Sequence, residues 1–411
     1  MFRVIRMLSL LVILLPFRMA AEDNFRFRSL KVSNPDNFMS PPVLRLGTDD
    51  RISINFDEIG DDYSELRYRL IHCDADWKRS VLTESEYIGG FNEEDVSDYA
   101  FSSNTFIHYV NYQITLPSET APILRSGNYL LEVYERDFPE KKLLSIPFMV
   151  SENLAKVKGE VSGRTDRGFN TEWQQLNLTV ELPSHLSGDA YRDMKVFVSQ
   201  NGADATRRQL AAPSRKSGNV AFYEHLRDLI FPAGNEYRRF ENVSTAFPGL
   251  NTDSVRFVGP GYHVWVKKDT PLNEADYVFD STQRGRFLIK EYNASDSNLG
   301  ADYVTAHFFL EMPKLNGGEV YIDGEMTHGV FNDHNRMRYN AAKGGYELEM
   351  PLKQGAYNYR YVVKYSDGSL GFSAIDGNKY ETRNEYWVAV YYREPGSRAD
   401  RLIGFSCILP V

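Results

Sequence analysis

One ten-residue stretch, Ile-His-Cys-Asp-Ala-Asp-Trp-Lys-Arg-Ser, gathers reactive side chain types between a strand and a turn. His72 with Asp74 or Asp76 would supply a general base and an orienting carboxylate. On a strand, His72 and Asp74 point to one side and Cys73 to the other, because successive side chains alternate. The same pattern is typical of a hydrogen-bonded strand end with Trp77 as a lid on the core. We favour this structural interpretation over catalysis.

A metal site is the next chemistry to consider. His328, Asp333 and His334 lie close together in a Gly- and Asn-rich segment, and two imidazoles with a carboxylate could bind zinc. Loop residues at such spacing are usually not ligands, so we expect no metal here. The other histidines are scattered along the chain.

Acidic residues cluster within one short region, as the pairs Asp49-Asp50, Asp57-Glu58 and Asp61-Asp62. A calcium loop needs ligands at alternate positions and a turn glycine. Gly60 is present but the alternation is not, so we expect a solvated loop. Paired acids for sugar cleavage have no local motif and are neither shown nor excluded.

Other motifs of catalysis are missing from the sequence. It contains no G-x-S-x-G, no G-x-G-x-x-G, no phosphate loop and no H-E-x-x-H. Together with the preceding observations, this favours a protein that is not an enzyme and has no cofactor.

Composition indicates a globular, β-rich protein. The chain has 411 residues, of which 42% are hydrophobic and 13% aromatic, and Tyr and Phe favour strands. The net charge of −9 argues against a nucleic-acid partner. Only Cys73 and Cys407 occur, so we expect two small core residues rather than a disulfide bridge, and no CxxC site.

The N-terminus resembles an export signal. Arg3 and Arg6 precede an apolar run from Leu8 to Phe17, and Ala20-Ala21 follow it. This layout predicts a signal peptide at residues 1–21, and the run is too short to cross a bilayer. No cysteine lies near the cut, so we expect an exported protein without a lipid anchor.

Period-two alternation recurs along the chain and predicts strands. Tyr357, Tyr359, Tyr361 and Val363 share one face of the clearest example, and Asp-Gly at positions 367–368 supplies a hairpin turn. Residues 66–73, 129–133, 176–182, 263–267 and 387–392 alternate in the same way. Residues 221–231 fit one helical face and a strand–loop–strand equally well, and both alternatives stay open.

Short strands between Gly, Pro, Asn and Asp clusters predict an all-β fold of tandem immunoglobulin/fibronectin-like β-sandwiches. Polar stretches at Ser151–Lys158 and Glu291–Asp302 suggest domain boundaries. We therefore expect an N-terminal sandwich at 22–152, a middle β-rich domain at 155–292 and a C-terminal sandwich at 300–411.

Several segments, spread over nearly the whole mature chain, form a distinctive series: the segment around Trp77, Tyr87–Phe91, Ser102–Thr105, Tyr109–Tyr112, Leu116-Pro117, Ser126–Leu130, Phe231–Arg238, Leu352–Tyr361 and Asn384–Trp387. This series resembles one known family, the plug protein of the type IX secretion system.

This resemblance implies a periplasmic protein of Bacteroidota-type bacteria, associated with the outer membrane by protein contact. We expect a monomer, because a stopper for a single opening needs no more. It would bind and seal the periplasmic opening of the very large translocon β-barrel, without a small-molecule substrate. The resemblance assigns no residue to catalysis, to a metal or to partner binding.

The last unit has a second resemblance, to early-set immunoglobulin domains of the kind that bind glycogen or starch in other proteins. It rests on Glu319–Gly324, Met337, Tyr346 and Gly355–Tyr359. No tryptophan follows Gly324 until Trp387, so the resemblance concerns the fold more than sugar binding. An exported carbohydrate-binding accessory protein is therefore the alternative function.

Overall fold

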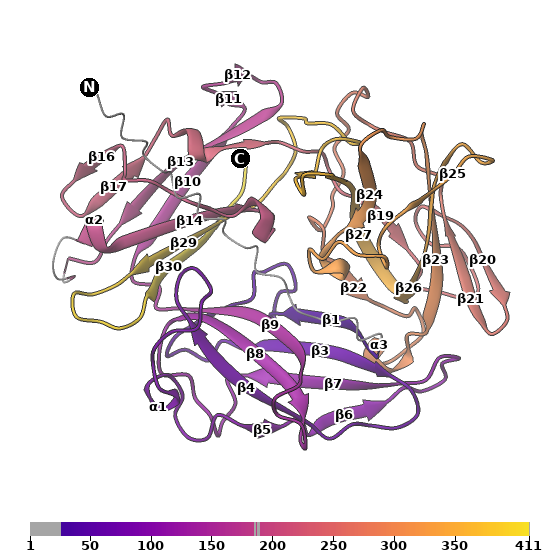
Figure 1. The fold of residues 1–411 in the computed structure, drawn as a ribbon, viewed down its shortest axis with the longest axis horizontal. Coiled ribbons are helices and arrows are strands. Elements are labelled where there is room, and N and C mark those ends of the chain that lie inside the picture. The colour runs from indigo at the N-terminus through magenta and orange to yellow at the C-terminus, as the bar shows by residue number, and fades with distance from the viewer. Residues whose placement is uncertain (1–25, 185, 187–189, 411) are drawn as a thin grey trace, which may run out of the picture.

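The computed structural model describes residues 26–184, 186 and 190–410, so the signal peptide expected at 1–21 lies outside it. Within this part of the chain the strands form three β-sandwiches (Figure 1). The prediction of an all-β fold of tandem sandwiches is confirmed. No helix of the described residues is long and apolar enough to span a membrane.

The first sandwich is continuous in sequence and contains the short helix α1 (Glu84–Tyr87). One of its sheets has the order β1 (Phe27–Ser33), β3 (Ile52–Ile59), β7 (Tyr109–Leu116) and β6 (Asp98–Phe101). The other has the order β2 (Val43–Arg45), β9 (Lys142–Ser151), β8 (Gly127–Glu135), β4 (Leu66–Cys73) and β5 (Glu94–Asp95). Alternate residues such as Ile52, Ile54 and Phe56 are fully buried between the sheets, as strand periodicity requires.

The second sandwich is made from two distant parts of the chain. One sheet contains β10 (Lys156–Ser162), β13 (Trp173–Glu181), β16 (Arg215–Ser217), β17 (Val220–Tyr223) and β18 (Ile230–Pro232). The other has the order β15 (Arg208–Gln209), β14 (Met194–Gln200), β29 (Tyr386–Tyr392) and β30 (Arg401–Ile408). In Figure 1 the yellow strands β29 and β30 accordingly lie beside the magenta strands of this sandwich. Smaller elements are α2 (Ala190–Asp193), the hairpin β11 (Arg164–Thr165) and β12 (Gly168–Phe169), and the 3-10 turns Asp204–Thr206 and Arg227–Leu229.

The third sandwich is inserted between β18 and β29. One group of strands comprises β19 (Arg238–Glu241), β22 (Phe287–Ile289), β24 (Gly318–Asp323), β27 (Gly355–Tyr365) and β28 (Leu370–Gly371). The facing sheet has the order β20 (Thr252–Val258), β21 (Gly261–Val266), β23 (Tyr303–Glu311), β26 (Gly345–Lys353) and β25 (Arg338–Asn340). Helix α3 (Ser297–Gly300) and the 3-10 turn Glu325–Thr327 complete it.

This topology corrects the expected boundaries of the second and third domains, 155–292 and 300–411. Strand β14 pairs with β29 along its whole length, from Met194 opposite Tyr392 to Gln200 opposite Tyr386. The C-terminal strands therefore belong to the middle sandwich, and the polar stretch 291–302 lies inside the third one. Residues 221–231 form strand, turn and strand, which resolves the alternative left open by the sequence.

The alternation in β29 places its two faces in different cores. Val388, Val390 and Tyr392 are buried inside the second sandwich. Ala389 and Tyr391 face the other way, into a cluster with residues of the first sandwich. Both faces of the strand are therefore buried, one of them in a contact between domains.

Candidate functional site at the junction of the three sandwiches

A cavity of about 750 Å³ lies where the three sandwiches meet. The first sandwich contributes Trp77 and Phe148, the second Phe197 and Trp387, and the third His328, among others. Trp77, expected as a lid on its own core, packs in the cluster shared with the second sandwich. The contacts around this cavity determine how the three domains are joined.

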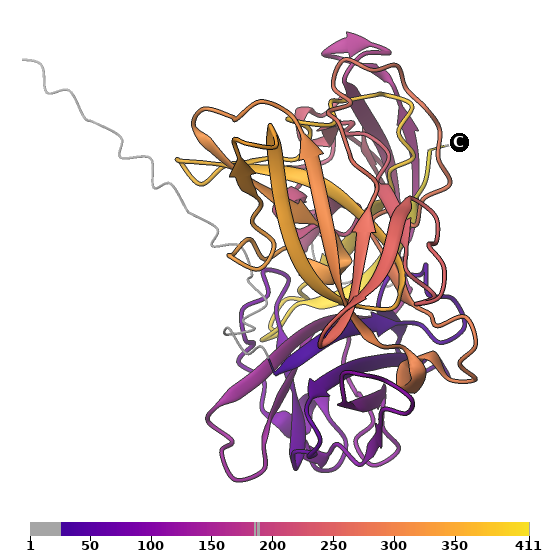
Figure 2. The ribbon, with the colours of Figure 1, turned by 90° about the vertical axis from the view of Figure 1, so that its right-hand side faces the viewer.

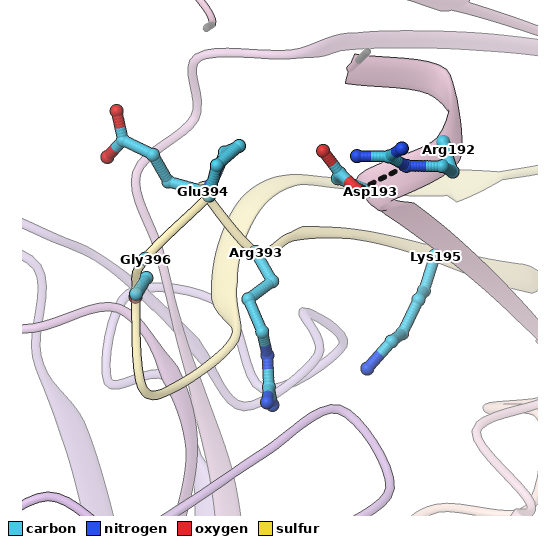
Figure 3. Close-up of a pocket in the computed structure, with 8 residues that line it drawn as sticks. Arg192, Asp193, Lys195, Arg393, Glu394 and Gly396 are labelled. Carbon is cyan, nitrogen blue, oxygen red and sulfur yellow. Dashed lines mark hydrogen bonds and ion pairs between the residues drawn. The ribbon is translucent and has the colours of Figure 1, made fainter. Parts of the chain in front are cut away.

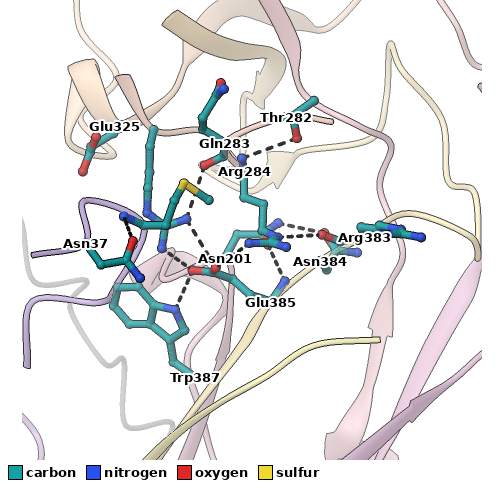
Figure 4. Close-up of polar contacts among 12 residues, drawn as sticks. Asn37, Asn201, Thr282, Gln283, Arg284, Glu325, Arg383, Asn384, Glu385 and Trp387 are labelled. Carbon is teal, nitrogen blue, oxygen red and sulfur yellow. Dashed lines mark hydrogen bonds and ion pairs between the residues drawn. The ribbon is translucent and has the colours of Figure 1, made fainter. Parts of the chain in front are cut away.

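Glu385 accepts hydrogen bonds from both the second and the third sandwich (Figure 4). Its carboxylate is buried, and Arg286 Nη2 donates to it at 2.6 Å. Arg284 Nη1 and the indole Nε1 of Trp387 donate to the same carboxylate, at 3.5 and 2.7 Å. Because Glu385 directly precedes β29 while both arginines belong to the inserted sandwich, this cluster fixes the point where the chain returns.

His328 lines the cavity from the third sandwich. It has a left-handed backbone conformation, with φ 52°, at the end of the Glu325–Thr327 turn. Burial lowers the pKa of His328 to about 4, and the Glu325 carboxylate opposes this shift. The imidazole is therefore neutral at physiological pH.

The contact between the first and third sandwiches is ionic and buried. Lys353 Nζ lies 2.7 Å from Asp57 Oδ2, and both side chains are only 1% exposed. The same carboxylate accepts hydrogen bonds from Tyr303 Oη and Asn111 Nδ2, each at 2.7 Å. Burial lowers the pKa of Lys353, and the Asp57 carboxylate opposes this shift. We call this set the ionic seam.

A second buried lysine reinforces the ionic seam. Lys31 Nζ, on β1, lies 2.5 Å from both Glu325 Oε2 and the backbone oxygen of Phe287. Burial lowers the pKa of Lys31, and Glu325 raises it again in part. Each buried ammonium thus has an oxygen partner across the domain boundary, as buried charges require.

The contact between the first and second sandwiches has an apolar centre, which is flanked by ion pairs such as Asp74–Arg393 and Glu152–Arg401. Its members, which we call the apolar seam, are Ala75, Met149, Phe197, Ala389, Tyr391 and Leu402. Polar contacts frame it: Tyr391 Oη donates to Asn128 Oδ1 at 2.7 Å, and the Ala75 amide donates to Asp400 Oδ2 at 3.0 Å. The buried centres of the two contacts therefore differ in chemistry, although ion pairs occur in both.

A smaller hollow of about 330 Å³ lies at α2 and the loop after β29 (Figure 3). Lys195 and Arg393 both line it, but both also pair with the buried carboxylate of Asp400, at 2.9 and 2.8 Å. Arg192 pairs with Asp193. These cations are engaged with the chain's own carboxylates.

The residues considered for catalysis do not converge. His72 is buried, with its Nδ1 2.9 Å from Ser80 Oγ and its Nε2 3.1 Å from the Ser126 oxygen. Asp74 instead accepts from the Asp400 amide at 2.8 Å, and it pairs with Arg393 at 2.9 Å. The strand end is hydrogen-bonded, and the geometry pairs His72 with no carboxylate.

The candidate metal ligands also make separate contacts and do not form one site. His328 faces the junction cavity, while Asp333 pairs with Arg336. No three His, Cys, Asp or Glu side chains among residues 26–184, 186 and 190–410 are arranged to hold a metal ion. Cys73 and Cys407 are free thiols, although Cys407 is only partly buried. Burial raises the pKa of both thiols to about 12.

The expectation of a solvated acidic loop is wrong for Asp57 and Glu58. Both are buried at the end of β3, 0% and 2% exposed, and Asp57 is the centre of the ionic seam. The alternation through Ile52, Ile54 and Phe56 shows that the strand continues to this point. It is the sequence feature that could have predicted that Asp57 and Glu58 lie on a strand. Its partner Lys353 lies 296 positions away in sequence, so the pair itself has no local signature.

Comparison with known proteins agrees with the fold. A crystal structure of a hypothetical protein from Parabacteroides merdae is 35% identical, with a TM-score of 0.91 over 94% of this chain and 97% of that one. Curated proteins gave no match. Residues 27–152 match the model of the type 9 secretion system plug protein 1st domain, which coincides with the first sandwich. The chain therefore belongs to the type 9 secretion system plug protein family.

Proposed function

We propose that this protein is a non-enzymatic periplasmic plug that binds and seals the periplasmic opening of the outer-membrane translocon barrel of the type IX secretion system. Family membership carries the proposal. The largest membrane barrels have about 36 strands, and an open lumen of that size would leak. A stopper for such an opening must be folded before it docks.

The structure suits this task because its three domains form a preformed body. The ionic seam, the apolar seam and the Glu385 cluster join every pair of sandwiches through buried groups. A body ordered in advance loses little conformational entropy when it binds, unlike a segment that folds on its partner. A monomer is sufficient for a single opening.

The direct test is affinity purification of the tagged chain from detergent-solubilised outer membranes. Recovery together with a very large barrel protein is expected, and recovery without one would contradict the proposal. Deletion of the gene should also raise sensitivity to large antibiotics, because the opening would lose its stopper. If the deletion leaves the permeability of the outer membrane unchanged, the protein does not seal the opening.

The alternative of an exported carbohydrate-binding accessory protein is tested by calorimetric titration with soluble glucans. A plug is expected to give no saturable heat, because its partner is a protein surface. Saturable heat would favour the alternative.

A further inference from the structure

One end of the molecule carries a row of exposed aromatic side chains that continues from the first sandwich onto the third. We call it the aromatic face, and its members are Tyr63, Tyr99, Phe101, Phe106, Phe257 and the half-buried Tyr262. The first five are 37–56% exposed. In Figure 1 the ends of β6 and β7 lie next to the β20–β21 hairpin at this place.

The rings contact one another instead of being dispersed. Tyr63 stacks on Tyr99 with ring centroids 4.8 Å apart, and Phe101 lies 6.4 Å from Tyr99. Phe106 lies 5.0 Å from Phe257 and 5.3 Å from Tyr262, across the boundary between the two sandwiches. These contacts form two clusters of rings, one on the first sandwich and one across its boundary with the third.

The loop that carries Phe106 is held in place by the third sandwich. The amides of Phe106 and Ile107 donate to the buried carboxylate of Asp302, at 2.8 and 3.1 Å. The Ser103 amide donates to the Leu299 oxygen at 2.9 Å. The aromatic face is therefore preorganised by contacts between domains (Figure 2 shows α3 against the first sandwich).

Single exposed aromatics are ordinary on protein surfaces, whereas contiguous exposed apolar patches mark interaction sites. Phe91, Phe138 and Phe169 are also exposed, at 52–88%, but within the part of the chain that the structure describes none of them lies in a ring pair of this kind. Phe169 instead lies under the guanidinium of Arg164. Contact between exposed rings across a domain boundary is what characterises the aromatic face.

On the first sandwich the border of the aromatic face carries exposed acidic residues, whereas the exposed Arg256 precedes Phe257 on the third. Asp61, Asp62 and Asp98 are exposed and precede its tyrosines directly in sequence. The Nδ1 atom of the exposed His108 lies 2.5 Å from Asp61 Oδ1. This charge complements a basic protein surface and disfavours an anionic lipid surface.

We propose that the aromatic face is the surface with which this plug meets its barrel. The partner is a protein surface at the periplasmic opening that offers apolar recesses with basic residues around them. This inference rests on the proposed function and names the docking face within it. Aromatic side chains clustered at the centre of an interface typically carry most of the binding energy.

The test compares two triple variants of the full chain by recovery of the barrel from solubilised outer membranes. The first, Tyr99→Ser with Phe106→Ser and Phe257→Ser, is expected to lower recovery at least about tenfold. The matched control, Phe91→Ser with Phe138→Ser and Phe169→Ser, removes three exposed rings that do not belong to the aromatic face and is expected to retain wild-type recovery. Melting temperatures of both variants check that they are folded.

Undiminished recovery by the first variant, with wild-type recovery intact, would overturn the docking face and leave the proposed function standing. Failure of the wild-type chain to recover a barrel would overturn the proposed function itself. If the first variant does not fold, the fully exposed pair Asp61→Lys with Asp98→Lys replaces it, and lowered recovery is again expected. Binding of the wild-type chain to phosphatidylglycerol vesicles, lost in the first variant, would instead assign the face to lipid.

Discussion

The first sandwich is joined to its neighbours by two seams whose buried centres differ in chemistry. Toward the second sandwich it presents apolar side chains that pack on Tyr391 and Leu402. Toward the third it presents Asp57 and Lys31, each paired with a charged group across the boundary. Apolar packing is non-directional, whereas a buried ion pair with several hydrogen bonds tolerates little displacement. The difference indicates that the apolar seam supplies adhesion and the ionic seam fixes orientation.

Breaking the ionic seam should have the largest effect. Lys353→Met leaves the Asp57 carboxylate buried without its cation, which costs about 3–5 kcal/mol of unfolding free energy. Chemical denaturation followed by circular dichroism measures the loss. The double variant Asp57→Asn with Lys353→Met removes both charges and should recover more than half of it. A single variant as stable as the wild type would contradict the role given to the pair.

Truncating a side chain in the apolar seam should lower the free energy of unfolding somewhat less. Leu402 is fully buried there, and Leu402→Ala should lower the unfolding free energy by about 3 kcal/mol through lost transfer energy and a cavity. The same denaturation experiment applies, and Leu402→Met is the control because its volume is conserved. If Leu402→Met lowers the free energy of unfolding as much as Leu402→Ala does, the exact shape of the side chain matters more in this seam than its apolar volume.

The junction cavity between the seams should respond to acid. The pKa of His328 is about 4 in the folded protein, below its ordinary value of 6.5. The unfolded chain therefore binds more protons in this window, so stability falls as pH drops from 6.5 toward 4. Between pH 7 and 5, wild type should lose about 2 kcal/mol more than His328→Asn, which retains a residue tolerant of positive φ. Equal losses in the two proteins would contradict the lowered pKa.

Removing an exposed ion pair should have the smallest effect on the free energy of unfolding. It provides the reference for the buried pair. Lys343 lies 2.7 Å from Glu347 on the surface of the third sandwich, and the side chains are 62% and 39% exposed. Lys343→Ala should leave the unfolding free energy unchanged within experimental error, because solvent screens such pairs. A loss comparable to that of Lys353→Met would mean that burial does not set the strength of these contacts.

The local sequence predicts strands and their faces well. Tyr357, Tyr359, Tyr361 and Val363 line the core of the third sandwich as their alternation indicates. Strand pairing is not local: β29 joins β14 across about 190 residues, so the inserted topology had no signal in composition or turns. The burial of Asp57 likewise depends on Lys353 from another domain, and an acidic pair next to a glycine is more typical of a loop.

The most direct test places a photoreactive phenylalanine analogue, p-benzoylphenylalanine, at position 106 or at position 138 of the full chain. Phe106 belongs to the aromatic face, whereas Phe138 is similarly exposed elsewhere on the first sandwich. Irradiation of cells should link the chain to a very large outer-membrane barrel protein from position 106 and not from position 138. If position 106 forms no adduct with the barrel, or if only position 138 does, the protein does not dock through the aromatic face.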